Sequence, residues 1–218
     1  MTDVGSEGVP PSHSSLLESL LLEARRYGFL GPGPVTDQIA RSLAFTKAVT
    51  AAPRLAIDLG SGGGIPGLVL ALAWPDTRWI FVDSNQRRTT WLGAAVAKLG
   101  AGRRLQVLCD RAENVGRSSW RGSADLVTAR SFAPPAPTAE CAAPLLKQGS
   151  RLLVADPPDH SPSRWPVQGL AEVGLVLEKT HVIETGSGPA SISSLVAVSV
   201  CPSRYPRRVG IPLKRPLF

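Results

Sequence analysis

The sequence predicts a Rossmann-like α/β fold in which seven strands form a mainly parallel sheet, preceded by N-terminal helices. From residue 54 onward, short runs rich in β-branched residues alternate with helical patterns. A glycine-rich segment, "DLGSGGGIPG" at residues 58–67, follows the first of these runs. The chain has 218 residues, a length that suits one α/β domain with a small extension.

Two helices are expected before the sheet. The first covers residues 14–27, where Ser14 or Ser15 can cap the helix. Its apolar stripe consists of Leu16, Leu17, Leu20, Leu21 and Ala24. The segment "GFLGPGP" then interrupts the pattern, and a second helix is predicted over residues 36–50 with Asp37 in its first turn.

The remainder reads as strands that alternate with helices and end in a final pair of strands. The expected parallel strands are residues 54–59, 78–83, 104–109, 124–129 and 150–155. The expected helices between them are residues 65–74, 86–100 and 137–149. The last two strands, 177–184 and 193–200, are predicted as an antiparallel pair. Such alternation is typical of a sheet covered by helices on both faces.

The predicted organisation has four parts: a disordered tail at 1–14, a helical extension at 15–53, the α/β domain at 54–202, and a basic C-terminal tail at 203–218 packed on or beside it. No apolar run approaches the roughly 20 residues of a membrane span, and the first residues lack a secretion signal. We therefore expect a soluble, cytoplasmic protein, with no membrane contact. The three cysteines and three histidines are scattered, so no metal site is predicted.

Charge is unevenly distributed along the chain. The net charge is +7, from 24 basic and 17 acidic residues, and no acid follows Glu184. The basic residues of the last segment are Arg204, Arg207, Arg208, Lys214 and Arg215. Such a tail suits a phosphate-rich partner, although a solvated terminus that only aids solubility would have the same composition.

Polar groups stand at the ends of four successive predicted strands. Asp58 and the glycine loop end the first strand, and Asp83 ends the second. The third ends in Asp110-Arg111-Ala112-Glu113 and the fourth in Arg130-Ser131-Phe132. In open α/β sheets these ends face one crevice, where a carboxylate in the place of Asp83 can accept both hydroxyls of a ribose. The pattern predicts an adenosine-containing cofactor.

The loop sequence narrows the choice of cofactor. No Gly-Lys-Ser/Thr closes the loop, which excludes a P-loop. Gly60, Gly62 and Gly64 have the spacing of a dinucleotide site, but Pro66 removes a backbone donor from the helix start that pyrophosphate requires. S-adenosylmethionine, which has no phosphate, fits better, and Asp58 could meet its ammonium group.

Several motifs carry a family resemblance from about residue 25 to the C-terminus. They are "DLGSGGGIPGLVLA", "DSNQRRTTWL", "RAE", "ARSFAP" and "RYPRRVGIPLKRPL". Together they resemble the bacterial glucose-inhibited division protein B family, whose members are S-adenosylmethionine-dependent 16S ribosomal RNA guanine-N7 methyltransferases. The resemblance implies a class I methyltransferase sheet of seven strands.

Site roles follow from the resemblance position by position. Gly60 and Ile65 would line the methionine end of the cofactor, and the other loop residues expected to bind the cofactor are Ser61, Gly62 and Gly64. Ala112 and Glu113 would flank the adenine, and Asp83 would lie at the ribose. Arg130 is the expected catalytic residue, reaching the cofactor or the target base from the end of the fourth strand. The expected partner is 16S ribosomal RNA or the 30S subunit, bound through the basic tail by a monomer.

Two departures from the family pattern lie on the expected substrate side. Many members have Arg-His where this chain has Arg41-Ser42, and many have Leu-Lys-Gly after the fifth strand, where this chain has "VADPPDH". A diverged paralogue is therefore an alternative, either a small-molecule methyltransferase or a non-catalytic RNA-binding protein. The "DPPD" at 156–159 follows the fifth strand and lacks a terminal aromatic residue, so it is not predicted to act as an amino-methyltransferase motif.

Overall fold

A computed structural model describes residues 11–157 and 162–218, and within them seven strands form one sheet in the order β3-β2-β1-β4-β5-β7-β6. The strands are β1 (Leu55–Leu59), β2 (Arg78–Asp83), β3 (Leu105–Cys109), β4 (Ala124–Ala129), β5 (Leu146–Asp156), β6 (Leu175–Thr185) and β7 (Gly188–Ala197). β1 to β5 pair in parallel, whereas β7 pairs antiparallel with both β5 and β6. The predicted seven-stranded, mainly parallel sheet is confirmed.

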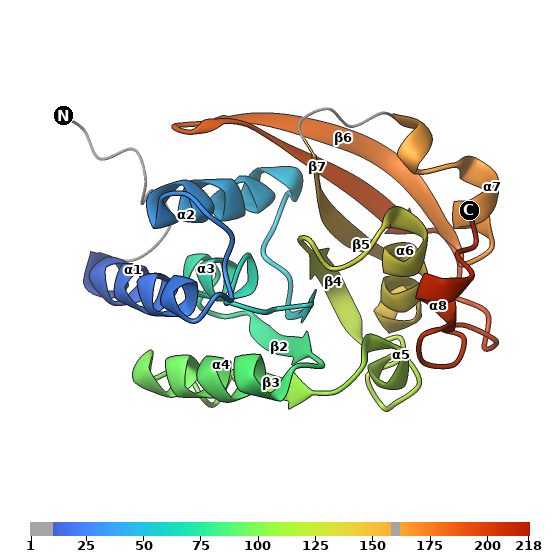
Figure 1. The fold of residues 1–218 in the computed structure, drawn as a ribbon. Coiled ribbons are helices and arrows are strands. Elements are labelled where there is room, and N and C mark those ends of the chain that lie inside the picture. The colour runs from blue at the N-terminus through green and yellow to red at the C-terminus, as the bar shows by residue number, and fades with distance from the viewer. Residues whose placement is uncertain (1–10, 158–161) are drawn as a thin grey trace.

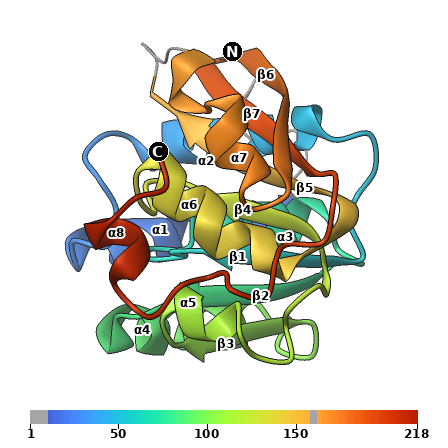
Figure 2. The same ribbon diagram turned by 90° about the vertical axis from the view of Figure 1, so that its right-hand side faces the viewer.

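Helices cover both faces of this sheet (Figure 1). One face carries α1 (Pro11–Arg26), α2 (Val35–Leu43), the 3-10 helix η1 (Ala44–Ala48), α3 (Gly67–Ala73) and α4 (Gln86–Lys98). The other carries α5 (Ala112–Val115), α6 (Pro135–Ala142), the 3-10 helix η2 (Ala143–Leu145), α7 (Val167–Ala171) and α8 (Ile211–Lys214), as the second view also shows (Figure 2). A further 3-10 helix, η3 (Pro162–Arg164), precedes α7.

Each face has its own apolar core. Trp79 and Phe81 of β2 point to the α1–α4 face, where Leu17, Leu68 and Leu92 are fully buried with them. Ile57 and Val127 point to the opposite face and pack with α6 and the segment after β7. The alternation of inward directions along each strand explains why both faces of β1, β2 and β4 are apolar. The parallel strands are therefore fixed in register, and their ends form a stable platform.

Several predicted element boundaries are wrong. The helix expected over 137–149 ends at Ala142, and β5 already begins at Leu146, because Pro144 cannot continue an α-helix and Leu146 pairs with Ala124 of β4. The helix expected over 36–50 becomes a 3-10 helix after Leu43. The last strand covers 188–197 rather than 193–200, and the three short helices α5, α7 and α8 were not predicted.

The termini of some predictions lie outside the described part of the chain. α1 begins at Pro11, three residues before the helix start expected at 14, and residues 1–10 of the predicted tail are not among those described. Residues 158–161, which include the end of the "DPPD" segment, are likewise outside it. In the described residues, no helix is both long and apolar enough to cross a membrane.

Candidate active site

The glycine loop between β1 and α3 is tied to the end of β2. The backbone amides of Gly60 and Ser61 both donate to the carbonyl oxygen of Val82, at 2.8 and 3.0 Å. The amide of Gly62 donates to Oδ2 of Asp83 at 2.9 Å. The loop is therefore held in one conformation by the neighbouring strand and its terminal carboxylate.

Two of the loop glycines are required by close packing. A Cβ atom at Gly60, where φ is +72°, would lie 2.8 Å from the ring of Phe132. A Cβ atom at Gly63 would lie 2.5 Å from Leu30 and 2.9 Å from the carbonyl oxygen of Phe29. Segments from the N-terminal helices and from the end of β4 thus approach the loop backbone from two directions. The missing side chains at Gly60 and Gly63 therefore allow close packing against the loop from two directions, and the loop also lines a cavity.

Asp58 lies beneath the loop and is fully buried. The parallel register sets it beside Thr128, whose hydroxyl donates to Oδ1 at 2.7 Å. Burial raises the pKa of Asp58 to about 7, although hydrogen bonding from Thr128 and Ser61 and the nearby Gly67 amide lower it. Oδ2 has no hydrogen-bond partner of good geometry among the described residues. The ammonium contact expected for Asp58 stays a prediction, because its carboxylate faces Thr128 and α3.

Asp83 occupies the end of β2, with only 7% of its surface exposed. Its Oδ1 accepts from the backbone amide of Asn85 at 2.8 Å, and Arg88 Nη1 lies 3.8 Å from Oδ2. The side chain that caps α4 is Asn85, which accepts from the Arg88 amide. Asp83 thus positions both the glycine loop and the start of α4 while it lines a cavity.

Ala112 and Glu113 are buried after β3. Arg111 donates to both carboxylate oxygens of Glu113, at 3.2 and 3.3 Å, and the Gly210 amide donates to Oε1 at 2.9 Å. Burial by itself raises the pKa of Glu113, but the hydrogen bonds from Gly210 and Arg111 outweigh it, and the pKa lies below its usual range. Glu113 is therefore a buried carboxylate that anchors the C-terminal segment.

Arg130 projects from the end of β4 toward the N-terminal helices. Its Nη2 donates to the side-chain oxygen of Gln38 in α2, whereas its Nη1 is buried without a hydrogen-bond partner among the described residues. Burial, together with the nearby charge of Arg41, lowers the pKa of Arg130 to about 10, so the guanidinium remains charged at neutral pH. Arg130 does not pair with Glu113, which is bound elsewhere.

Three adjoining cavities surround the strand ends. The acidic cavity, about 270 Å³, is lined by Asp83, Asp110, Ala112 and Glu113 among others. The glycine cavity, about 220 Å³, is lined by Gly60, Ser61, Gly62, Ile65 and Arg130 among others. The arginine cavity, about 270 Å³, lies beyond β4 and is lined by Arg41, Arg130, Phe132, Asp156, Arg164 and Trp165 among others.

Ser131 joins the three spaces because it lines all of them. Its φ is +52°, the one non-glycine residue of the described chain with a positive φ. Such backbone strain is concentrated at functional sites in proteins. Phe132 follows it and separates the acidic cavity from the arginine cavity, with its ring over Gly60.

The structure brings most of the predicted site residues together. Asp58 and Gly64 line none of the three cavities and act from beneath the loop. No sequence motif marked the side chains of the arginine cavity as site residues; these side chains are Arg41, Phe132, Asp156, Arg164 and Trp165. The departures from the family pattern at Arg41-Ser42 and after β5 could have indicated this cavity, because Arg41 and Asp156 both line it.

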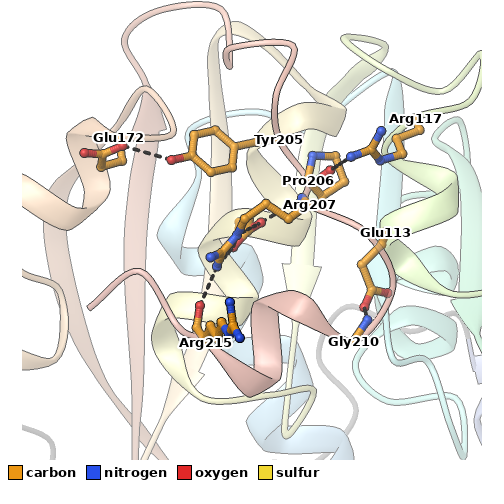
Figure 3. Close-up of polar contacts among 9 residues, drawn as sticks. Glu113, Arg117, Glu172, Tyr205, Pro206, Arg207, Gly210 and Arg215 are labelled. Atoms are coloured by element: carbon orange, nitrogen blue, oxygen red, sulfur yellow. Dashed lines mark hydrogen bonds and ion pairs between the residues drawn. The ribbon is translucent and has the colours of Figure 1, made fainter.

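The C-terminal segment is bound closely to the fold (Figure 3). Arg207 donates to both oxygens of Glu140 in α6, at 2.6–3.1 Å, and to the Arg215 carbonyl at 2.7 Å. Tyr205 donates to Glu172 at 2.9 Å, and Arg117 donates to the Pro206 carbonyl (Figure 3). Two of the basic residues expected to meet a phosphate-rich partner are therefore paired with acidic side chains of this chain: Arg207 with the buried Glu140, and Arg204 with Glu172 at the surface.

Three other basic side chains of this segment face solvent. They are Arg208, Lys214 and Arg215, which have no side-chain hydrogen bond or ion pair within the described part of the chain. Pro212 and Leu213, from α8, line the acidic cavity. The segment thus combines a wall of the candidate site with an exposed cationic surface.

No metal centre is evident at the candidate site. Among residues 11–157 and 162–218, no group of three or more His, Cys, Asp or Glu side chains is arranged to hold a metal ion. The polar groups around the cavities are arginines, carboxylates and backbone amides, which suit an organic zwitterion and a polar base.

Comparisons with known proteins agree with this arrangement. A family model described as GidB, rRNA small subunit methyltransferase G, matches residues 34–156. The ribosomal RNA small subunit methyltransferase G of Prochlorococcus marinus (strain MIT 9313) is 38% identical over 169 residues, which cover 76% of this chain and 68% of the relative. The protein of that name from Syntrophomonas wolfei is 36% identical over 74% of this chain and 76% of its own length.

Solved structures show the same fold at low sequence identity. Cofactor-bound Rv0187 from MTB has a TM-score of 0.63 at 15% identity, covering 85% of this chain and 91% of that one. An O-methyltransferase from Bacillus cereus in complex with SAH has a TM-score of 0.57 at 15% identity, covering 84% and 91%. At such identities the likeness concerns the fold alone.

Proposed function

This chain belongs to the rRNA small subunit methyltransferase G family, and from that premise we propose that it transfers a methyl group from S-adenosylmethionine to N7 of a guanine in 16S ribosomal RNA. The observation that carries the proposal is the junction at residues 130–132. There, the cavities along the glycine loop and beside the Asp83 carboxylate adjoin a separate polar cavity beyond β4. Two adjoining spaces are what a transfer between a bound cofactor and a bound base requires.

The residues present fit the cofactor. Asp83 would accept the ribose hydroxyls in the acidic cavity, where Ala112 and Glu113 would lie beside the adenine. The methionine end would lie along Gly60, Ser61, Gly62 and Ile65, with Gly64 supporting the turn. Asp58 would stabilise the ammonium side from beneath the loop. When bound, S-adenosylmethionine supplies an electrophilic methyl group on a sulfonium.

The reaction needs no general base on the protein. Guanine N7 carries a free lone pair at neutral pH, so the chain's task is to hold N7 in line with the methyl group and exclude water. Orientation of this kind can supply much of the rate gain. Arg130, fixed by Gln38 and left with one unpartnered nitrogen, would orient the base or its phosphate through its planar fork. Phe132 would close the space between the cofactor and the base.

The ribosomal partner would be bound in part by the exposed cations. Arg208, Lys214 and Arg215 lie on the segment that also walls the acidic cavity, and phosphate contacts of this kind dominate affinity for nucleic acid. We place the protein in the cytoplasm as a monomer that acts on the small subunit or its RNA.

The test is methyl transfer from labelled S-adenosylmethionine to 16S RNA and to 30S subunits that lack the N7 mark, with cofactor affinity measured by calorimetry. Transfer to one guanine, abolished by Arg130→Ala and retained by Arg103→Ala, would support the proposal. Arg103 is an exposed arginine outside the three cavities. Tight cofactor binding without transfer would point to a small-molecule substrate, and no cofactor binding would point to an RNA-binding protein.

A further inference from the structure

The arginine cavity holds one acidic side chain at its far wall. Asp156 ends β5, where its side chain is fully buried. The Ser193 hydroxyl donates to Oδ2, and Arg164 Nε lies 3.4 Å from Oδ1. That ion pair does not meet hydrogen-bond geometry, so Oδ1 is buried without a hydrogen-bond partner among the described residues. An ionised carboxylate can accept several hydrogen bonds, so the site has unused acceptor capacity.

Three donors around the same cavity are also unsatisfied. They are Arg130 Nη1, Trp165 Nε1 and the Arg164 Nε that lies near Asp156, each buried without a hydrogen-bond partner in the described part of the chain. Native proteins leave few such groups, because each loses its hydration without recovering a hydrogen bond. A buried acceptor and buried donors without hydrogen-bond partners thus line one cavity of about 270 Å³, which indicates a site for a planar polar ligand that has both kinds of group.

The order of the strands sets the direction in which that ligand must lie. β4 stands between β1, which carries the glycine loop, and β5, which ends in Asp156. Asp156 is therefore two strand spacings, about 10 Å, from the cofactor side. A base between them would present one edge to the cofactor and the opposite edge to Asp156.

Guanine edges fit this placement in one orientation. If N7 receives the methyl group, the N7 edge faces the cofactor and cannot be read by the protein. Base identity must then be read on the Watson–Crick edge, as enzymes that act on extruded bases do. On that edge guanine presents two donors, N1–H and the N2 amino group, which only an acceptor can read. Asp156 Oδ1 is the buried unpartnered acceptor at this cavity among the residues described.

We propose that Asp156 is the specificity-determining residue for the target base, accepting hydrogen bonds from N1–H and the N2 amino group of guanine. Ser193 and Arg164 hold the carboxylate in place, and Arg130 or Trp165 donates to O6. Adenine is rejected because its N1 is an acceptor and would face the carboxylate. The inference rests on the proposed function, and it concerns a position at which this chain lacks the lysine typical of the family pattern.

The test measures nucleotide preference separately from catalysis. GMP, IMP and AMP are titrated into the protein saturated with S-adenosylhomocysteine, and affinities are read by ligand-observed NMR. The wild type is expected to bind GMP about 10- to 100-fold more tightly than AMP, with IMP between them because it lacks only the N2 amino group. Asp156→Asn is expected to reduce the preference for GMP to threefold or less, while S-adenosylhomocysteine affinity stays within twofold.

Glu178→Gln is the matched control, because Glu178 is an exposed carboxylate of β6 that pairs with Arg151 outside the cavity. It should keep the wild-type ranking. The order of the GMP, IMP and AMP affinities is measured on the wild-type protein. That measurement can therefore refute the proposal even if Asp156→Asn does not fold. Equal binding of the three nucleotides by the wild type, or an unchanged preference in a folded Asp156→Asn, would overturn it.

Methyl transfer to 30S subunits separates this inference from the proposed function. If the wild type methylates a guanine and Asp156→Asn does so with unchanged kcat/KM, the specificity assignment fails and the function stands. If the wild type methylates no RNA but shows the Asp156-dependent GMP preference, the function fails and the base site stands. If kcat/KM falls by tenfold or more in Asp156→Asn but not in Glu178→Gln, the result supports both the proposed function and the specificity assignment.

Discussion

The backbone amide of Gly210 donates a 2.9 Å hydrogen bond to the carboxylate of Glu113, although the two residues lie 97 positions apart. Glu113 lines the acidic cavity, and Gly210 is the N-cap residue of α8, whose Pro212 and Leu213 line the same cavity. Figure 3 shows the contact between Glu113 and Gly210, and with Pro212 and Leu213 the C-terminal segment forms part of the wall of the expected adenine site. Ligand binding at the cofactor site should therefore reduce opening of the C-terminal segment.

Cofactor binding should therefore protect the C-terminal segment from trypsin. A ligand that binds only the closed arrangement lowers the population of opened states by a factor of one plus the ratio of ligand concentration to Kd, which is about 100-fold when the ligand is present at 100 times its Kd. With S-adenosylhomocysteine at 100 times its Kd, cleavage after Arg208 and Lys214 should slow by tenfold or more. Cleavage after the exposed Arg103, measured in the same digest, is the internal reference. Equal protection at Arg103, or none at Arg208, would show that the segment moves independently of the site.

The pairing of Arg207 with Glu140 should be worth much more to stability than its place in a basic tail suggests. Glu140 is fully buried, so removing Arg207 leaves an uncompensated carboxylate in the core. Breaking such a pair costs about 3–5 kcal/mol, which corresponds to a fall in Tm of roughly 6–20 °C at this chain length. Arg207→Ala should show this fall in thermal unfolding, whereas Arg208→Ala, an exposed neighbour, should change Tm by less than about 2 °C. Equal effects would mean that the ion pair adds no net stability.

The exposed basic side chains of the C-terminal segment should contribute to RNA affinity but not to cofactor affinity. Replacing Arg208, Lys214 and Arg215 together by Ala should weaken RNA binding and reduce the slope of log Kd against log salt by about 2, since each lost phosphate contact removes roughly 0.7–0.9. S-adenosylhomocysteine affinity should remain within twofold, because none of the three side chains pairs within the described fold. A slope equal to that of the wild type would place the RNA surface elsewhere.

Sequence reasoning succeeded where a local pattern had one structural consequence. The strand segments ending at Leu59, Asp83, Cys109 and Ala129 are found at the predicted positions, because a buried parallel strand needs a continuous apolar run. The convergence of Asp83, Ala112, Glu113 and Arg130 follows from the parallel arrangement of those strands. The apolar strand segments therefore predicted the sheet, and the polar residues that follow them predicted the outline of the site.

The sequence indicated less where long-range contacts determine the role of a residue. Composition left open whether the basic tail binds a phosphate-rich partner or is only solvated, and it did not indicate that Arg204 and Arg207 pair with Glu172 and Glu140, which lie in distant helical segments. The role of Asp156 depends on Ser193 of β7, and no local pattern indicates that pairing. Where charged side chains are buried by a tertiary contact, composition alone cannot separate a structural ion pair from a binding surface.

Asp83 should be essential for the cofactor site through two linked effects. It is placed to accept ribose hydroxyls, and it already accepts from the Gly62 amide at 2.9 Å. Asp83→Ala is expected to weaken S-adenosylhomocysteine binding at least tenfold, about 1.4 kcal/mol. Asp83→Asn keeps one acceptor oxygen and should lose less. Unchanged calorimetric affinity in Asp83→Ala would remove this residue from the site.

The pKa of Asp58 gives a stability signature with a definite sign. Burial raises that pKa from 3.8 to about 7, so the folded state binds more protons than the unfolded state between these values. Stability contributed through this group is therefore present at low pH and is lost as pH rises from about 4 to 7. The rise of about 3 pKa units corresponds to roughly 4 kcal/mol across that window.

Asp58→Asn should remove most of this pH dependence, because an amide does not ionise. The measurement is the free energy of urea unfolding at pH 5 and pH 8 for both proteins. From pH 5 to pH 8 the free energy of unfolding of the wild type should fall by about 2–3 kcal/mol relative to that of Asp58→Asn, because the wild-type carboxyl group must ionise in a fully buried site. Asp125→Asn is the control: burial raises the pKa of Asp125, but the hydrogen bonds from Lys147 and the Leu55 amide outweigh it and hold the pKa below its usual value. Asp125 is therefore ionised in both the folded and the unfolded state from pH 5 to pH 8, and Asp125→Asn should change stability by the same amount at both pH values. A difference between wild type and Asp58→Asn that does not vary with pH would mean that Asp58 keeps an ordinary pKa beneath the loop.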